Sequence, residues 1–181
     1  MIKGLMILAD GFEQVEALDT SDIIERSHEI SIDLVSLSET KEAISSHKTR
    51  LLLSKSISEI DSEEYDFLVL PGGKIGMENL KNSAKVQQIV LSFHKNNKLI
   101  SAICASPSIF GHLGLLKGKK YTCFPGFESS DGEYINASVI KDGKMITGHS
   151  MAYSLEFGLE IVDYFLGKEA VKRIRNGIEG N

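Results

Sequence analysis

Residues 98–110 read Lys-Leu-Ile-Ser-Ala-Ile-Cys-Ala-Ser-Pro-Ser-Ile-Phe, and they pass from an apolar run through small residues to a proline. The run 99–103 has the length of a buried strand and stops at Cys104, which small residues flank. Pro107 then occupies the first turn of a helix, where proline is tolerated because the N–H it lacks has no helical partner. The stretch therefore predicts a strand, a sharp turn at Cys104 and a helix.

Cys104 is the candidate reactive atom of this turn. A thiol at a helix N-terminus meets unpaired N–H groups and the positive end of the helix dipole, and both favour the thiolate. The competing interpretation is a buried hydrophobic residue, because free cysteine is among the most buried residue types. Groups that stabilise a reactive thiol, if they lie near Cys104, favour the first interpretation.

The composition is that of an ordinary globular protein. A chain of 181 residues with 42% hydrophobic and 25% charged residues can bury a core, and without repeats or linkers it predicts one domain over 1–181. The net charge of -5 offers no basic surface to nucleic acid or an anionic membrane, and no apolar run reaches the roughly 18 residues of a membrane span. Two cysteines make no disulfide framework, so we expect a reducing, cytoplasmic location.

Strand and helix patterns alternate along the chain, which predicts an α/β sandwich with a mostly parallel sheet. Near-continuous apolar runs are typical of strands buried on both faces. We expect strands at 2–9, 30–37, 67–70 and 99–103, a hairpin around Asp142-Gly143, and helices at 12–27, 77–96, 154–166 (N-cap Ser154, stop Gly167) and 168–177.

Three turns should meet at the carboxyl ends of these strands, where ligands bind in such folds. They are residues 10–16, 71–76 and 104–107. Their convergence places two acidic residues and a glycine turn near the candidate thiol.

Glu13 and Glu16 lie three residues apart in the first helix and share one face. Acidic residues near a helix N-terminus are ordinarily solvated, and this interpretation suffices for Glu13. Glu16 lies one turn deeper between Val15 and Ala17, so the alternative is a partly buried carboxyl of raised pKa. Such a group would donate a proton to a thiolate or act as a general acid–base.

Gly72 and Gly73 end the central strand with backbone N–H groups that can bind an oxyanion. A glycine pair alone is a weak signal. With Cys104 beside it and the N–H of Ala105 available, the pair predicts an oxyanion hole.

The five histidines are scattered, and none pairs with cysteine or carboxylate at metal-ligand spacing, so we expect no metal site. His47 and His149 fall in loops that can approach the site, and His149 is the candidate auxiliary base. Ser106 is a second auxiliary candidate, although no G-x-S-x-G elbow supports a serine nucleophile. Cys123 is interpreted as a structural or a peripheral thiol.

Four segments together resemble the DJ-1/PfpI (ThiJ) superfamily, and most closely its DJ-1 branch. They are Ala-Asp-Gly-Phe-Glu-Gln-Val-Glu-Ala at 9–17, Leu-Pro-Gly-Gly at 70–73, Ala-Ile-Cys-Ala at 102–105 and Leu-Glu-Phe at 155–157. The resemblance runs nearly the whole chain and implies a flavodoxin-like three-layer sandwich, usually a homodimer, without a dissociable cofactor. It further implies that Cys104 is the nucleophilic, oxidation-prone cysteine, Glu16 its protonated partner, and Gly73 and Ala105 the oxyanion donors.

Several positions depart from the family pattern. Ala105 stands where protease-like members carry histidine, which disfavours a cysteine peptidase or hydrolase. Phe124 stands where the DJ-1 branch often carries histidine, which removes a candidate base. Ser106 replaces a common glycine, and His-Ser-Met-Ala at 149–152 replaces Arg-Gly-Pro-Gly, so the rim of the pocket is altered.

Two functional hypotheses follow from these residues. In the first, the chain is a glyoxalase III or deglycase type enzyme: Cys104 attacks a small reactive carbonyl compound such as methylglyoxal, and Glu16 moves a proton between its carbons. In the second, the chain is a non-catalytic redox sensor or chaperone-like protein of oxidative-stress protection, and Cys104 stops at a sulfinate held by Glu16. The phenylalanine at 124 favours the second.

Overall fold

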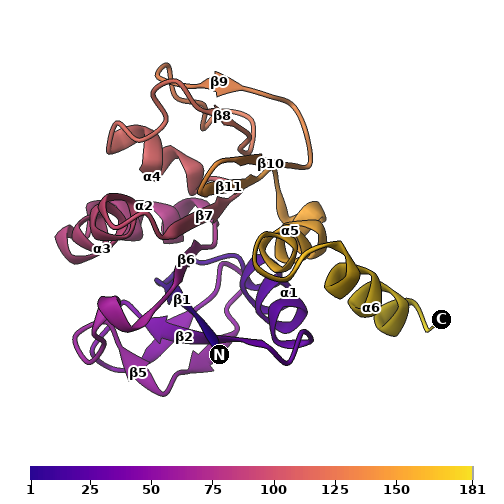
Figure 1. The fold of residues 1–181 in the computed structure, drawn as a ribbon. Helices are drawn as coiled ribbons and strands as arrows, with labels where there is room; N and C mark the ends of the chain where they lie inside the picture. The colour runs from indigo at the N-terminus through magenta and orange to yellow at the C-terminus, as the bar shows by residue number, and fades with distance from the viewer. Residues whose placement is uncertain (181) are drawn as a thin grey trace.

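The computed structural model describes residues 1–180, and its centre is a seven-stranded sheet in the order β10-β11-β7-β6-β1-β2-β5 (Figure 1). All neighbouring strands run parallel except the edge pair β10–β11. This mixed, mostly parallel α/β sheet confirms the predicted fold class. The strands are β1 (Ile2–Leu8), β2 (Ile30–Ser36), β5 (Lys55–Ser56), β6 (Phe67–Leu70), β7 (Leu99–Ile103), β10 (Val139–Asp142) and β11 (Met145–Gly148).

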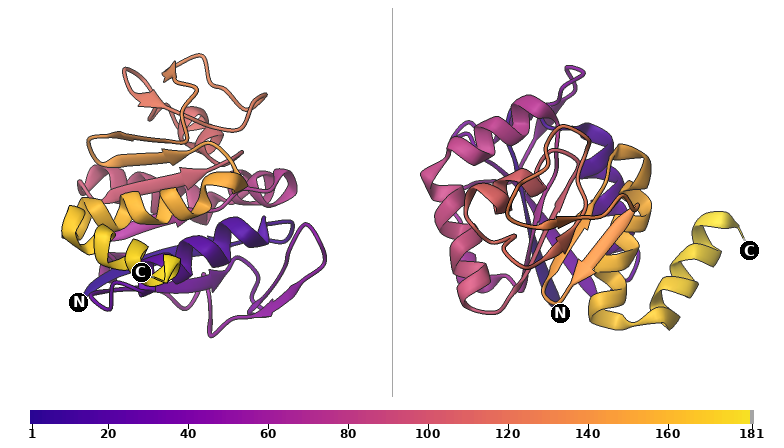
Figure 2. Two further views of the ribbon diagram at one scale, coloured as in Figure 1. Left: turned by 90° about the vertical axis from the view of Figure 1, so that its right-hand side faces the viewer. Right: turned by 90° about the horizontal axis from the view of Figure 1, so that it is seen from above.

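Helices cover both faces of the sheet and make the other two layers. The helices α2, α3 and α4 lie on one face, and α1 and α5 lie on the other, with α6 packed on the outside of α5 (Figure 1). Figure 2 shows that α6 extends away from the body of the protein. The helices are α1 (Gln14–Glu25), α2 (Lys74–Asn82), α3 (Ala84–Lys95), α4 (Pro107–His112), α5 (Ser154–Leu166) and α6 (Lys168–Glu179), with short 3-10 turns η1 (Ser62–Glu64) and η2 (Met151–Tyr153).

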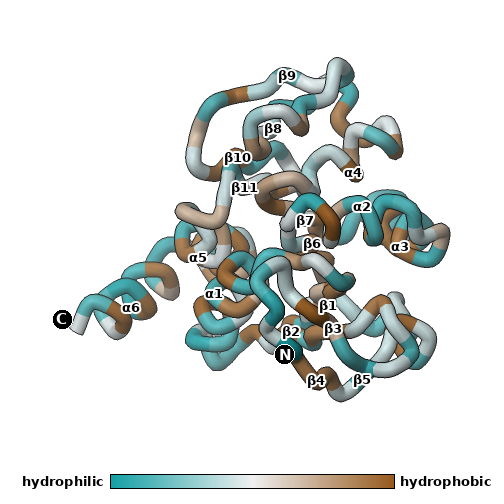
Figure 3. The backbone as a smooth tube through the Cα atoms, turned by 180° about the vertical axis from the view of Figure 1, so that it is seen from behind, coloured by the Kyte–Doolittle hydropathy of each residue, from teal (hydrophilic) through white to brown (hydrophobic). Residues whose placement is uncertain are grey.

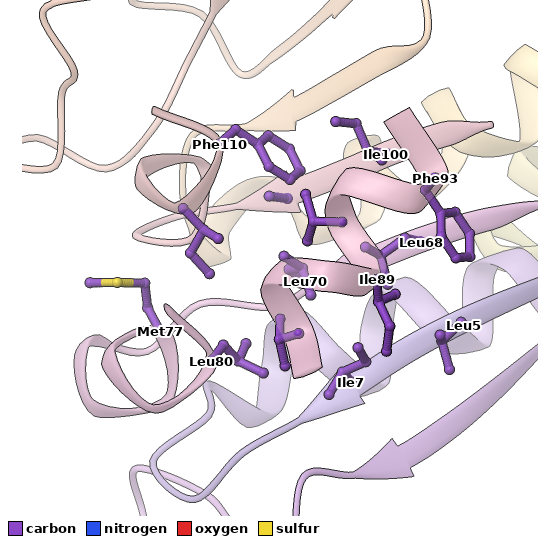
Figure 4. Close-up of a cluster of buried hydrophobic side chains, with 14 of the residues drawn as sticks. Leu5, Ile7, Leu68, Leu70, Met77, Leu80, Ile89, Phe93, Ile100 and Phe110 are labelled. Atoms are coloured by element: carbon purple, nitrogen blue, oxygen red, sulfur yellow. The ribbon is translucent and has the colours of Figure 1, made fainter. Parts of the chain in front are cut away.

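The alternation of side chains along β1 explains why the sheet has two buried faces. Leu5 and Ile7 point into the cluster under α2 and α3 (Figure 4), whereas Met6 and Leu8 belong to the cluster under α1 and α5. All four side chains are fully buried. A strand with helices on both sides needs apolar residues at every position, which is the continuous run seen in the sequence. The hydropathy colouring in Figure 3 shows the same apolar interior.

Besides shifts of up to three residues at other helix ends, the helices differ from the sequence prediction at two points. The single helix predicted at 77–96 is two helices, because Ser83 adopts an extended ψ of 114° and its hydroxyl accepts a hydrogen bond from the Val86 N–H at 3.3 Å. Ser154 begins α5 instead of capping it, since its hydroxyl donates to the Met151 carbonyl at 2.8 Å. The predicted hairpin at Asp142-Gly143 is confirmed by the β10–β11 pairing.

A small hairpin, β3 (Glu42–Ile44) and β4 (Arg50–Leu52), lies against the start of α1. Its turn is held by two backbone bonds: the Gly11 N–H donates to the Ile44 carbonyl at 2.7 Å, and the Ser46 N–H donates to the Phe12 carbonyl at 2.8 Å. A second small pair, β8 (Lys120–Tyr121) and β9 (Glu133–Tyr134), runs parallel and lies outside the central sheet. The first hairpin matters for the site because its turn covers the beginning of α1.

Candidate active site

The candidate thiol stands at the corner between β7 and α4, in the conformation that the sequence predicts. Cys104 has a φ of 63°, a left-handed conformation that costs a non-glycine residue of order 1–3 kcal/mol. Neighbouring segments hold the corner on both sides. The Cys104 N–H donates to the Gly148 carbonyl at 2.9 Å, and the Cys104 carbonyl accepts from the Phe124 N–H at 2.8 Å. The thiol is therefore presented by a strained turn that its surroundings fix.

The glycine turn after β6 packs directly against this corner. A Cβ on Gly72 would lie 2.7 Å from the Cys104 Cβ and 2.7 Å from Glu16 Oε2, so only glycine allows this approach. Gly73 has a φ of 86°, and a Cβ there would collide with the Gly11 carbonyl oxygen. The Ser106 hydroxyl donates to the Pro71 carbonyl at 2.6 Å and ties the two turns together. All three predicted turns therefore meet.

Glu16 lies beneath the thiol with only 1% of its surface exposed. Its Oε2 accepts a hydrogen bond from the Gly72 N–H at 2.7 Å, while Oε1 is buried without a hydrogen-bond partner among the described residues. Burial raises the pKa of Glu16 to about 7, against the opposing effects of Cys104 and the Gly72 N–H. The carboxyl is thus largely protonated up to neutral pH, as the sequence argument considered.

The electrostatics of Cys104 correct one sequence-based expectation. Burial, together with the charge of the Glu16 carboxylate, raises the pKa of Cys104 to about 12. The N–H groups of Gly73 and Ala105 act in the opposite direction and stabilise the thiolate, but they do not prevail. The N–H donors of the turn favour the thiolate, but the thiol and the carboxyl share one desolvated space, which favours the neutral thiol more strongly. Above about pH 7 the pair therefore holds one negative charge and one proton, and the sulfur is nucleophilic in the form in which that proton lies on Glu16.

A cavity of about 300 Å³ opens over the sulfur. Two apolar side chains stand at its opening, since Phe124 is 44% exposed and Met151 is 47% exposed. Its size fits a carbonyl compound of a few carbon atoms. The cavity is lined by Glu13, Glu16, Gly73, Cys104, Phe124, Ser150, Met151 and Ala152.

The two auxiliary candidates do not reach this cavity. His149 is absent from its lining, and the imidazole instead lies with Nδ1 3.3 Å from the Thr122 hydroxyl and its ring against Tyr153. Ser106 is fully buried, and its hydroxyl is committed to the Pro71 carbonyl, so its role is to hold the turn. Cys123 is fully buried in the core, as expected for a structural thiol.

Glu13 belongs to the site, contrary to the solvated role that the sequence assigned to it. Its side chain is only 14% exposed, and the turn between β3 and β4 lies against it, since Ser46 Oγ donates to Glu13 Oε2 at 3.0 Å. The spacing of three residues from Glu16 was the available signal, since it places both carboxyls on one helix face. The covering hairpin is a long-range contact that this spacing does not reveal.

Two further features concern the whole range of residues 1–180. No cluster of three or more histidine, cysteine, aspartate or glutamate side chains in this range has the geometry to hold a metal ion. Within the same range, no helix combines the length and apolar character that a membrane span requires.

The fold and the site together define a class: an α/β sandwich whose central feature is a cysteine in a strained strand–helix turn beside a buried, protonated carboxyl. The comparisons with known proteins agree. The chain belongs to the DJ-1/PfpI family, whose family model matches residues 3–164.

Curated relatives and solved structures support the DJ-1 branch of the family. The chain is 38% identical over 168 residues to Protein DJ-1 homolog B of Arabidopsis thaliana, covering 91% of this chain but only 38% of the plant protein. It is 30% identical to Protein dj-1beta of Drosophila melanogaster, covering 97% of this chain and 96% of the fly protein. The crystal structure of Drosophila DJ-1beta superimposes with a TM-score of 0.92, covering 98% of this chain and 97% of the fly chain. Oxidized Toxoplasma gondii DJ-1 gives the same TM-score at 28% identity, with 98% of each chain covered.

Proposed function

We propose that the protein converts small reactive aldehydes, of which methylglyoxal is the test case, through a covalent bond to Cys104. The observation that carries this proposal is Glu16, a carboxyl that stays protonated to about pH 7 and lies against the thiol inside a cavity of about 300 Å³. A protonated acid next to a nucleophile supplies the proton that an aldehyde oxygen needs when the carbon is attacked.

The first step is addition. The sulfur of Cys104 bonds to the aldehyde carbon, and the electron pair of the C=O bond moves to oxygen. The N–H groups of Gly73 and Ala105, which already stabilise charge on the sulfur, are placed to bind this oxygen, which takes the proton of the Glu16–Cys104 pair. The product is a hemithioacetal, and Glu16 is left as a carboxylate.

The second step is an internal oxidation and reduction. The Glu16 carboxylate removes the proton on the first carbon and returns it to the second carbon, while the hydroxyl proton of the first carbon passes to the oxygen of the second. The first carbon is thereby oxidised to a thioester and the neighbouring ketone is reduced to an alcohol. Water then cleaves the thioester and releases lactate. The reaction needs no external oxidant, because both changes occur in the same molecule.

The test is lactate formation from methylglyoxal, followed by NMR. We expect Cys104→Ser to abolish the product and Glu16→Gln to lower its rate by about 10²-fold or more, because amides do not exchange protons with carbon. Glu156→Gln is the matched control, since Glu156 also lies in the first turn of a helix but does not line the cavity. Lactate formation by the Cys104→Ser variant at the wild-type rate would refute the proposal.

A second candidate function, redox sensing or chaperone-like protection under oxidative stress, is favoured by two observations. No imidazole lines the cavity, and Glu16 Oε1 is buried with no hydrogen-bond partner among residues 1–180. A sulfinate at Cys104 would give that oxygen a partner. Two equivalents of peroxide convert the thiol to sulfinate, each transferring one oxygen and leaving one water.

Mass spectrometry after limited peroxide treatment separates this candidate from the enzyme. The sensor hypothesis expects a stable gain of two oxygens at Cys104 without measurable lactate formation, and a further gain in Glu16→Ala, where nothing retains the sulfinate. Oxidation of Cys123 at the same rate as Cys104 would contradict both functions, because it would show that the site confers no selectivity.

We further infer that the protein works as a homodimer in the cytoplasm. The family membership supports the dimer, and two free cysteines support a reducing compartment. Sedimentation of the purified protein tests the first inference, with a monomer at micromolar concentration as the refuting result. Imaging a tagged chain in cells tests the second, and a signal confined to an organelle would overturn it.

A further inference from the structure

Glu13 begins a hydrogen-bonded chain that leads out of the cavity. Ser46 Oγ donates to Glu13 Oε2 at 3.0 Å, and the same hydroxyl lies 3.1 Å from His47 Nδ1. Glu13 lines the cavity, whereas the His47 side chain is 73% exposed to solvent. Three groups that can each carry a proton thus connect the space above Cys104 with the surface of the chain.

The fold holds this chain in place through the turn of the β3–β4 hairpin. The Ser46 N–H is bound to the Phe12 carbonyl at 2.8 Å, next to Glu13 in the sequence. Ser45 pairs with Phe12 as a β-bridge, and its hydroxyl donates to Gln14 Oε1 at 2.8 Å. The turn is therefore fastened to the residues on both sides of Glu13, which keeps the Ser46 hydroxyl over the carboxylate.

The proposed aldehyde reaction creates a need for such a path. Hydrolysis of the thioester consumes one water and yields a carboxylate, so of the two water protons one restores the Glu16–Cys104 pair and the other must leave. Glu16 has no route for it: one oxygen accepts from the Gly72 N–H, and the other is buried against Cys104. No histidine lines the cavity.

We propose that Glu13 is the general base for this hydrolysis and that Ser46 and His47 carry the proton from it to solvent. This proposal rests on the aldehyde function proposed above. Glu13 removes a proton from the attacking water, whose oxygen bonds to the thioester carbon while the carbon–sulfur bond breaks. Glu13 then donates its proton to Ser46 Oγ, the Ser46 hydroxyl donates its own to His47 Nδ1, and the imidazole loses a proton to water.

Glu13 and Glu16 therefore divide the work between them. Glu16 serves the carbon–hydrogen step deep in the cavity, and Glu13 serves the water step near its opening. Glu16 repels charge on Glu13, and His47 Nδ1 lies 3.9 Å from Glu13 Oε2. These two roles explain why Glu13 and Glu16 lie three residues apart on one face of the helix.

Intact-mass measurement during methylglyoxal turnover tests the role of Glu13. We expect Glu13→Gln to slow lactate release by about 10²-fold, the lower end of general-base effects, and to accumulate a lactoyl adduct on Cys104. Glu16→Gln should accumulate no lactoyl adduct, because it stops at the earlier step. Lactate release by Glu13→Gln at the wild-type rate would overturn the proposal.

Chemical rescue tests the relay. We expect His47→Ala to lower turnover by roughly tenfold, less than a true general base because water replaces part of an exposed imidazole. Added imidazole should restore the rate in proportion to its concentration, which a merely structural role would not produce. His149→Ala is the matched control and should show neither loss nor rescue. In a protein that already carries Ser46→Ala, His47→Ala should cause no further loss of turnover. The double variant should therefore have the same rate as Ser46→Ala alone.

The outcomes separate the two proposals. A wild-type protein that forms neither lactate nor adduct refutes the aldehyde function and the relay with it. A wild-type protein that forms lactate, together with a His47→Ala variant of undiminished rate, refutes the relay alone. Independent, multiplicative losses in the Ser46→Ala and His47→Ala variants also refute it, since groups in one path act as a unit.

Discussion

The two cysteines of this protein differ in surroundings far more than in acidity. Burial raises the pKa of both Cys104 and Cys123 to about 12. Cys123 packs in the core with no exposed surface, and none of the groups acting on its pKa stabilises the thiolate. Cys104 has a carboxyl that can hold its proton, two N–H donors and a cavity above it. Reactivity at this site is thus built from a proton partner and from access, and the thiol pKa alone does not distinguish the two cysteines.

The largest expected effect is on alkylation of the native protein. We expect iodoacetamide to modify Cys104 at least roughly 10²-fold faster than Cys123, because the latter must wait for a local opening of the core. Peptide mass spectrometry over time measures both rates in one sample. In denaturant the two rates should become equal, and equal rates in the native protein would remove the basis of the comparison.

Gly73→Ala should destabilise the fold by about 3 kcal/mol or more, because its φ of 86° is joined by a collision with the Gly11 carbonyl. Gly126→Ala is a matched control: its φ is 91°, but a Cβ there meets nothing within 4 Å, so about 1 kcal/mol is expected. Urea unfolding measures both. Equal losses would show that close packing of the glycine turn contributes nothing beyond its backbone conformation.

Glu16→Gln should change how stability depends on pH. Glu16 ionises near 4.5 in the unfolded chain and near 7 in the folded protein, so the folded state holds the proton more tightly between these values. The contribution of this group is complete below pH 4.5 and is lost as the pH rises through 7, by about 3 kcal/mol. The glutamine variant, which can still accept from the Gly72 N–H, should lack this loss.

Urea unfolding of both proteins at pH 5 and pH 8 measures the difference. The variant is expected to gain stability relative to the wild type at the higher pH. If the stability of both proteins depended on pH in the same way, ionising Glu16 in the folded protein would cost no free energy. That result would contradict the burial of Glu16.

Ser106→Ala should have the smallest effect of the four, about 1–2 kcal/mol, because it leaves the buried Pro71 carbonyl without its hydroxyl donor. Thermal unfolding measures this loss. The rate of Cys104 alkylation should fall with it, since the turn that carries Gly73 is no longer tied to the turn that carries the thiol. Ser108→Ala, which removes a local bond to the Ala105 carbonyl at 2.6 Å, tests whether any serine in this turn has the same effect.

The local sequence pattern predicts much of the fold and the turn that carries Cys104. The apolar runs predict strands that are buried on both faces, and small residues around Cys104 predict the corner that has a φ of 63°. The break at Ser83 escaped prediction because apolar residues keep helical spacing across it, and only the serine cap reveals the change of direction. Helical spacing identifies a face and does not identify an interruption.

The parts of the site that escaped prediction depend on contacts between distant segments. Glu13 is covered by a hairpin some thirty residues later in the chain, as the Ser46 bond at a separation of 33 residues shows. The burial that raises the pKa of Cys104 also depends on contacts between distant segments. The local sequence shows only the N–H donors, which lower that pKa. His149 and His47 both lie in loops, and nothing in the sequence distinguishes the one that reaches Glu13 from the one that packs on Tyr153.

The bond from the Cys104 N–H to the Gly148 carbonyl has a consequence for the protein during its synthesis. Strand β11 ends at Gly148 and lies beside β7 in the sheet, so the corner is fixed only once this late strand has left the ribosome and paired. Until then Cys104 is an ordinary cysteine in an unfinished chain, with neither its strained turn nor a complete cavity. The reactive site therefore arises only when β7 and β11 have paired, as a property of the folded protein.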